Sequence, residues 1–367
     1  MNILKAALLL LSLLMLTCVV PGFSAANDSS YYFYHGRSYG SEETFNPLTT
    51  ILNGGFGILQ ISSRSNRISD IDFSTGLRNV TYNLSHPFSA IEKFGWNRFL
   101  SQEVIPTSYK LKEAQYFPNY ELHLIGGGAT FRMFLEWYRW HQFPKPVLWS
   151  LTSWFSYHLI NEVVENNTYQ GPSVDVLADM YIFNVGGLLL FSSDRVSRFF
   201  GQTLQLRDWS FMPAYDPALQ TIENIGQNFM IKIKLPFWKP WSLMYHFGVH
   251  GTWGLSYRRR DGRSFSLTGG LIAKDIVDID NGSGVRSQTT NLVWTVAMFY
   301  DLNNSLLASL ILAGTKGYKV RLNIYPGIFR IGNFSPAFFI SLRDDNALVT
   351  GFHVHFSPFG LAQRFGM

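Results

Sequence analysis

The 367-residue sequence has little cysteine and little charge. Its one cysteine, Cys18, lies in the hydrophobic N-terminal segment, and charged residues make up 15% of the chain, against about 25% in typical globular domains. The mean hydropathy is only +0.04, and beyond that segment polar side chains interrupt the apolar runs, whereas a transmembrane helix needs about 20 predominantly apolar residues. The composition therefore excludes a disulfide-stapled domain and a bundle of membrane-spanning helices.

The first 26 residues, MNILKAALLLLSLLMLTCVVPGFSAA, have the features of an export signal. Lys5 precedes an apolar run, Pro21 and Gly22 interrupt that run, and small residues follow. Secretory signal peptides have this order, so we predict cleavage before Asn27. An uncleaved anchor and a lipidated Cys18 are the alternatives. Without residues 1–26 the chain has no cysteine, which fits a bacterial envelope better than a eukaryotic secretory compartment.

Residues 201–367 alternate between apolar and polar side chains, as the stretch Ser242–Tyr257 illustrates. Large apolar residues such as Tyr245 and Trp253 occupy every second position, and His246 and His250 lie among the residues between them. This period of two indicates strands with two different faces. Turn residues separate the predicted strands, which makes an antiparallel meander. The predicted strands are 228–235, 242–257, 264–273, 291–301, 305–314, 318–325, 337–342 and 347–356.

The export signal, the cysteine-free remainder, the aromatic-rich meander and the segment Phe352-His353-Val354-His355-Phe356 resemble bacterial outer-membrane β-barrel proteins. The resemblance implies a mainly β fold in which the meander closes into a membrane barrel of about 8–12 strands. It also implies location in the cell outer membrane, with outer-membrane lipid, lipopolysaccharide and the outer-membrane insertion machinery as partners. Such barrels often end on an aromatic residue, whereas here Gly366 and Met367 follow Phe365. The mildly basic pI of about 9.1 points to no nucleic-acid partner.

Two further regions precede the meander. Residues 27–119 are polar and irregular, with short candidate strands at 55–62 and 70–77. Residues 120–200 change to a helical pattern that predicts three helices, at 121–141, 147–165 and 173–200. Polar side chains interrupt all three, so we expect this helical block inside the barrel as a plug or at its periplasmic mouth.

The helical block carries the only candidates for catalysis. His158 and Glu162 are four residues apart and share a helix face, as do Asp175 and Asp179. If these faces met near His123, they would offer nitrogen and oxygen ligands for a metal or a general acid/base pair. The full candidate set is His123, His158, Glu162, Glu165, Asp175 and Asp179. The alternative is that the carboxylates pair with Arg132, Arg139, Arg195 or Arg198. No metal-binding or nucleophile motif occurs, so neither a metal nor a cofactor is predicted.

Two polar groups belong to the meander. His246, His250, His353 and His355 are predicted to line the lumen of the barrel. Arg258, Arg259, Arg260 and Arg263 surround one turn and are predicted to contact lipid head groups. Three functions remain open: a non-enzymatic outer-membrane protein with a structural, solute-passage or binding role; an outer-membrane enzyme acting on lipid or lipopolysaccharide; and a soluble periplasmic α+β protein that binds an apolar ligand.

Overall fold

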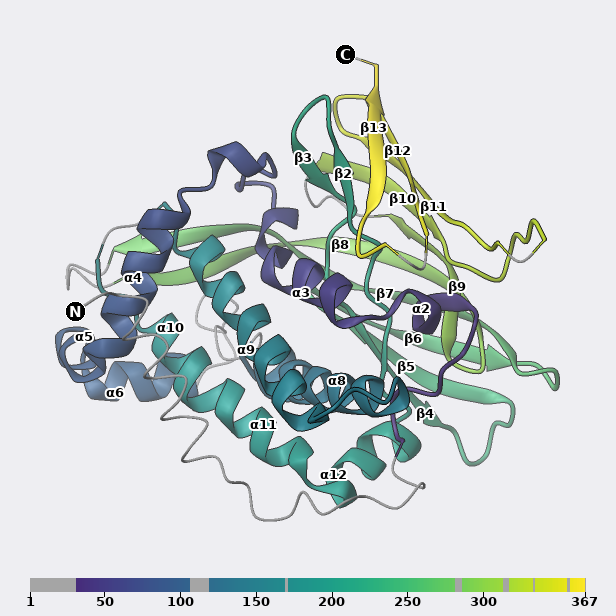
Figure 1. The fold of residues 1–367 in the computed structure, drawn as a ribbon, viewed down its shortest axis with the longest axis horizontal. Helices are drawn as coiled ribbons and strands as arrows, with labels where there is room; N and C mark the ends of the chain where they lie inside the picture. The colour runs from purple at the N-terminus through teal and green to yellow at the C-terminus, as the bar shows by residue number, and fades with distance from the viewer. Residues whose placement is uncertain are drawn as a thin grey trace.

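A computed structural model describes residues 31–105, 119–168, 171–280, 286–312, 317–332, 334–354 and 357–366. These residues form a helical layer beside one large sheet (Figure 1). Helices account for 41% of the structure and strands for 31%, so the fold is mixed rather than mainly β. The predicted signal peptide lies outside the described residues.

The N-terminal region is helical, and the short strands predicted at 55–62 and 70–77 are wrong. Asn46 caps the first long helix by accepting a hydrogen bond from the Thr49 amide, and Pro47 follows at the first helical position, where its missing N–H has no cost. Asp72 caps a second helix by accepting from the Thr75 amide. These local caps outweigh the alternation. The elements are α2 Gly40–Thr44, α3 Pro47–Gly55, η1 Gly57–Gln60, η2 Ile68–Asp70, α4 Phe73–Ser85, α5 Pro87–Phe94, α6 Trp96–Phe99 and η3 Leu100–Val104.

The helical block lies where the sequence predicts it, in more segments than expected. They are η5 Asn119–Gly127, α8 Gly128–Trp140, α9 Pro146–Glu165, α10 Asp175–Leu177, η6 Ala178–Phe183, α11 Asn184–Ser192, α12 Asp194–Arg198 and η7 Phe199–Thr203. The run Asp175–Ser192 is long and apolar enough to cross a membrane by length and composition alone. However, 61% of it is buried inside the protein, as in the core helix of a globular domain.

Gly128 and Gly187 let the helices of the block approach closely. A Cβ on Gly128 would lie 2.6 Å from the Gly187 carbonyl oxygen, and one on Gly187 would lie 2.5 Å from the Leu124 carbonyl oxygen. Both obstacles are backbone atoms, which cannot move aside without shifting a helix. The close contact between α11 and the junction of η5 with α8 therefore depends on glycine.

We expect Gly187→Ala to destabilise the protein by about 1–3 kcal/mol, the usual cost of overpacking. Gly57→Ala is the matched control, because a Cβ there meets nothing within 4 Å. The control should be neutral or slightly stabilising. The measurement is the midpoint of urea unfolding for both variants. Equal midpoints would mean that the helices do not touch at Gly187.

The sheet has thirteen strands in the order β1-β4-β5-β6-β7-β8-β9-β10-β11-β12-β13-β2-β3. Neighbours are antiparallel except for the parallel pair β13 and β2. The strands are β1 Arg207–Asp208, β2 Ala214–Asp216, β3 Thr221–Glu223, β4 Phe229–Lys234, β5 Trp241–Phe247, β6 His250–Arg258, β7 Arg263–Asp280, β8 Arg286–Leu302, β9 Ser305–Leu312, β10 Tyr318–Ile324, β11 Ala337–Arg343, β12 Leu348–His353 and β13 Gly360–Phe365. The predicted meander is confirmed from β4 to β12, but the single strand predicted at 242–257 is wrong, because β5 and β6 form a hairpin there.

Four strands were not predicted, and the predicted closure does not appear. They are β1, β2 and β3, which have too few residues for alternation to reveal them, and the six-residue C-terminal strand β13. They replace the strands expected from residues 27–119. In the described part of the chain, β1 and β3 are the sheet edges, and strand pairing does not join them into a ring.

The two faces of the sheet can be named by their residues. The inner face carries Met230, Met244 and Phe299, which meet Trp209 and Tyr325 in one buried cluster. The outer face carries the alternate positions of the same strands. Along β10 a register shift between Tyr318 and Val320 interrupts this alternation. Tyr318 and Arg321 are consequently both buried, whereas Lys319 is exposed.

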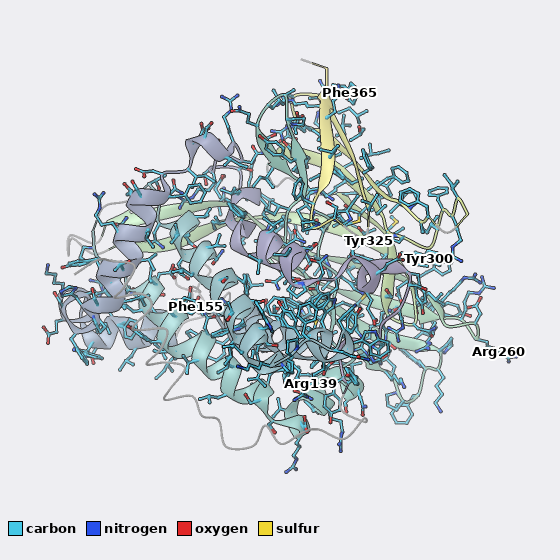
Figure 2. All side chains as sticks on the ribbon, in the orientation of Figure 1. Arg139, Phe155, Arg260, Tyr300, Tyr325 and Phe365 are labelled. Atoms are coloured by element: carbon cyan, nitrogen blue, oxygen red, sulfur yellow. The ribbon has the colours of Figure 1, made fainter. Side chains whose placement is uncertain are left out.

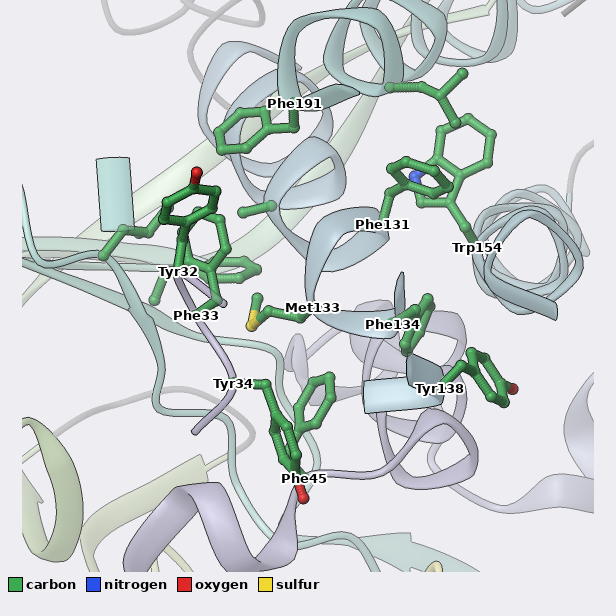
Figure 3. Close-up of a cluster of buried hydrophobic side chains, with 14 of the residues drawn as sticks. Tyr32, Phe33, Tyr34, Phe45, Phe131, Met133, Phe134, Tyr138, Trp154 and Phe191 are labelled. Atoms are coloured by element: carbon green, nitrogen blue, oxygen red, sulfur yellow. The ribbon is translucent and has the colours of Figure 1, made fainter. Parts of the chain in front are cut away.

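The helical block packs on the outer face of β4 and β5. Phe229, Tyr245 and Phe247 belong to the same buried cluster as Phe131 and Phe134 of α8. Figure 3 shows the residues that the helices contribute to this cluster, including Phe131 and Phe134. The expected plug inside a lumen is therefore wrong for this contact, because inner-face residues alternate with these. The apolar face of the stretch Ser242–Tyr257 is covered by helices at Tyr245 and exposed at Trp253.

Candidate functional site

Three of the predicted site residues lie together inside the helical block, and each comes from a different segment. The π-helix η5 carries His123, α9 carries His158, and the π-helix η6 carries Asp179. The Nε2 atom of His123 lies 3.2 Å from Oδ2 of Asp179. The two imidazole rings lie 5.7 Å apart between centroids. The structure thus brings His123, His158 and Asp179 into one buried cluster.

Asn184 fixes the orientation of the His123 ring. Its Oδ1 atom lies 3.0 Å from the Nδ1 atom of His123, so the ring nitrogen donates a proton to this amide oxygen. The Nε2 atom facing Asp179 is then the basic nitrogen of a neutral ring. Asn184 lies in the third predicted helix, 173–200, but no spacing in the sequence joins it to the site.

His158 is buried without a hydrogen-bond partner. It is 1% exposed, and neither ring nitrogen has a partner among the described residues. The rings of Trp154 and Tyr157 pack against it. A Cβ on Gly127 would lie 3.0 Å from Nε2 of His158, so glycine is needed for the imidazole to approach η5. A buried polar group without a partner is rare in native proteins.

Burial changes the charge states of the cluster. It lowers the pKa of His123 to about 4, against the opposing hydrogen bond to Asn184. Burial and the nearby His123 hold the pKa of His158 well below its usual value. Burial and then the charges of Asp175, Glu162, Glu165 and Glu103 raise the pKa of Asp179. Both imidazoles are therefore neutral at pH 7.

The other predicted carboxylates surround this cluster at longer range. Glu162 is buried, whereas Glu165 and Asp175 are half-buried. Glu103, on the π-helix η3, was not predicted because residues 27–119 gave no readable pattern. Burial, then the charge of Asp175, raises the pKa of Glu103 to about 8.

Arginine–carboxylate pairs do form in the helical block, for example with Glu136 and Asp194, which are not among the predicted site carboxylates. Arg132 donates to Glu136 at 3.0 Å and pairs with Asp194 at 2.7 Å. Asp179 pairs instead with His123. The arginine pair and the histidine cluster are therefore separate polar centres of the helical block.

The predicted lumen histidines lie on the inner face of the sheet. Nε2 of His250 lies 2.6 Å from Nδ1 of His246, and both rings are buried. His353 is buried on β12, while His355 lies outside the described residues. Their lumen role remains a prediction.

The predicted basic turn joins β6 to β7. Arg258, Arg259, Arg260 and Arg263 are all exposed. Asp261 pairs with Arg263 at 2.9 Å, and Arg258 donates to the Asn303 side chain. Figure 2 shows Arg260 at a tip of the sheet, far from Phe155 in the helical block. Contact of this turn with head groups remains a prediction.

Comparison of the chain with known protein families, with characterised proteins and with solved structures finds no match. The function must therefore be argued from the sequence and geometry alone.

Proposed function

We propose that the chain is an integral outer-membrane protein with a structural or binding role, whose sheet contacts lipid through its outer face. The observation that carries the proposal is the polarity of the two faces. On β6, Trp253, Leu255 and Tyr257 are exposed, whereas Thr252 and Ser256 between them are buried. A sheet in water has the opposite arrangement, with polar side chains outward.

The same inversion extends across the neighbouring strands. The exposed outer-face residues are Phe265, Leu267, Trp294, Val296, Met298, Phe338, Ile340, Leu342, Leu348, Phe352, Leu361 and Phe365. The buried polar residues between them include Ser264, Ser266, Thr268, Thr295, Asp301 and Ser341. Apolar-out and polar-in alternation is the arrangement of membrane barrels. Apolar surfaces of this breadth on a soluble monomer would otherwise require a partner.

Several inner-face polar groups bond to one another, although the Ser341 hydroxyl and Oδ1 of Asn323 are buried without a partner among the described residues. Ser266 donates to Ser256 at 2.8 Å, and Thr268 donates to Thr252 at 3.0 Å. The Lys232 ammonium lies 2.5 Å from the Asp301 carboxylate. Side chains that bond to each other in this way fill an interior rather than line an open path. This favours a structural or binding role over solute passage.

Closure of the barrel is part of the proposal, with residues 207–216 as the closing segment. The Trp209 amide donates to the Asn228 carbonyl beside β4. The Gly360 amide at the start of β13 donates to the Pro213 carbonyl. One irregular segment thus bonds to both ends of the ten-strand run β4 to β13. A closed ring would leave no strand edge in lipid, where unpaired backbone groups are costly.

The turns at one end of the sheet have side chains suited to a membrane–water boundary. Phe237 and Trp238 in the β4–β5 turn are 93% and 68% exposed. The arginine-rich β6–β7 turn lies at the same end, because every second turn of an antiparallel meander falls at the same end of the sheet. Aromatic rings and basic side chains are favoured at this boundary, near lipid phosphates.

Fractionation of cells tests the proposal. The protein should stay with the outer membrane after osmotic shock, require detergent for release, and run faster on a gel before boiling than after. Quantitative release by osmotic shock would contradict the proposal and favour the soluble periplasmic α+β protein. A change in the mass profile of lipid A on Asp179→Asn, with folding intact, would favour the enzyme that acts on lipopolysaccharide.

A further inference from the structure

We propose that His123, His158 and Asp179 form a binding site for one divalent transition-metal cation of the zinc type. The inference concerns the helical block and does not depend on how the sheet meets lipid. The sequence raises these residues as possible ligands but contains no ligand motif, so it predicts no metal.

The backbone carrying the cluster is unusual. His123 lies on the π-helix η5, Asp179 on the π-helix η6, and the nearby Glu103 on the π-helix η3. π-helical turns are rare and are found frequently at functional sites. Three such segments, each supplying one polar residue to the same interior region, indicate that the backbone positions these side chains for a task.

Several buried nitrogen and oxygen atoms in the cluster, of the kinds that can ligate a metal, have no hydrogen-bond partner among the described residues. They are both ring nitrogens of His158 and Oδ1 of Asp179. His158 is 1% exposed and Asp179 is 3% exposed. Because a native core normally satisfies such atoms, the lone pairs of Asp179 Oδ1 and of the unprotonated nitrogen of His158 point to a bound group that accepts electron pairs. A cation does this, and neutral imidazoles are the form that binds one.

The spacing of the paired residues fits a shared ion. Two ligands of a tetrahedral zinc ion, each bonded at about 2.0–2.1 Å, lie about 3.3 Å apart. The observed separation of His123 Nε2 and Asp179 Oδ2 is 3.2 Å. Asn184 holds the other ring nitrogen of His123, which is the supporting contact that ligating histidines commonly have. Nearby carboxylates, including Asp175 and Glu162, act electrostatically on Asp179 and favour a positive ion.

Rotation of one side chain would complete the site. Among the described residues, no group of three or more histidine, cysteine or acidic side chains is positioned to hold a metal ion, so the proposed site requires His158 to move. The His158 ring lies 5.7 Å from the His123 ring between centroids and is the proposed third ligand. A turn of this ring would have to bring one of its nitrogens to the His123–Asp179 pair. A water molecule then takes the fourth position of a tetrahedral ion.

Cobalt and zinc titrations of the full chain test the site. After treatment with a chelator, the wild-type protein in detergent should bind one Co²⁺ with the visible absorption of tetrahedral coordination, and Zn²⁺ should displace it. Asn184→Ala keeps all three donors and should weaken the affinity about 10–100-fold. His158→Ala and Asp179→Asn should abolish the cobalt spectrum. His86→Ala, at an exposed histidine, should bind like the wild type.

Two results would overturn the metal site. The first is a folded wild-type protein that gives neither a cobalt spectrum nor heat on zinc addition, a result that needs no variant to fold. The second is binding that persists unchanged in His158→Ala and Asp179→Asn. Neither result bears on the membrane location, which fractionation tests separately.

Discussion

Leu267→Arg, on the face proposed to contact lipid, is expected to destabilise the protein by about 2–4 kcal/mol, the range for arginine on the lipid face of a barrel near the bilayer midplane. Leu267 is 56% exposed and pairs with Leu255 and Met298 across the outer face. All three side chains point the same way, so the arginine has no polar neighbour there. In water the same exposed substitution would change stability by only about 0.5 kcal/mol.

Leu77→Arg is the matched control for Leu267→Arg. Leu77 lies on α4 and is 39% exposed, but it belongs to the helical region rather than to the sheet. Urea unfolding of each variant in lipid vesicles compares the two sites. If both substitutions had equally small effects, the outer face of the sheet would be in contact with water.

Glu136→Ala is expected to destabilise the helical block by about 3–5 kcal/mol, the usual cost of breaking a buried ion pair by removing one partner. The Glu136 carboxylate is 0% exposed. It accepts hydrogen bonds from Arg132 and from the amides of Tyr32, Phe33 and Tyr34. Its loss leaves the buried Arg132 and three amides without this acceptor. The N-terminal segment 32–34 should also become sensitive to protease.

Asp194→Asn provides the comparison for Glu136→Ala. Asp194 also pairs with Arg132, but its side chain is 54% exposed, so solvent screens the interaction. We expect a loss of no more than about 1 kcal/mol. Urea unfolding and limited proteolysis would measure both variants. If Asp194→Asn were as damaging as Glu136→Ala, the account of the carboxylate as the acceptor that docks residues 32–34 would be wrong.

Alternation along the strands made the sheet predictable from the sequence. It did not predict what covers each face of that sheet. In the stretch Ser242–Tyr257, the period of two places Tyr245 and Trp253 on one face and His246 on the other, as the structure has it. The pattern cannot distinguish helix from lipid as the neighbour of an apolar residue. Tyr245 packs among helices, and its hydroxyl bonds to Glu121, while Trp253 remains exposed.

The helices of residues 27–119 escaped prediction because their signals are local caps rather than periodicity. Asn46 and Asp72 each cap a helix, and such residues are equally common in turns. The two- and three-residue strands β1, β2 and β3 are too short to alternate. Pairing with distant segments, such as β13 with β2, determines them, and a single sequence does not contain that information.

The candidate site was predictable in its residues but not in its geometry. The four-residue spacing placed His158 and Glu162 on one face of α9, and both are buried. Asp179 lies in the π-helical turn η6, where the helical period changes, and it is more deeply buried than Asp175. Contact between His123 and Asp179 depends on the packing of η5 against η6, which no spacing within the sequence specifies.

Spin labels at Leu267→Cys and Ser266→Cys, in the cysteine-free chain without residues 1–26 reconstituted into vesicles, test most directly whether the outer face of the sheet contacts lipid. We predict that the label at position 267 collides often with oxygen, which dissolves in lipid, and rarely with a water-soluble nickel complex. A label at position 267 that collides with the nickel complex as often as one at Leu77→Cys would contradict this contact with lipid.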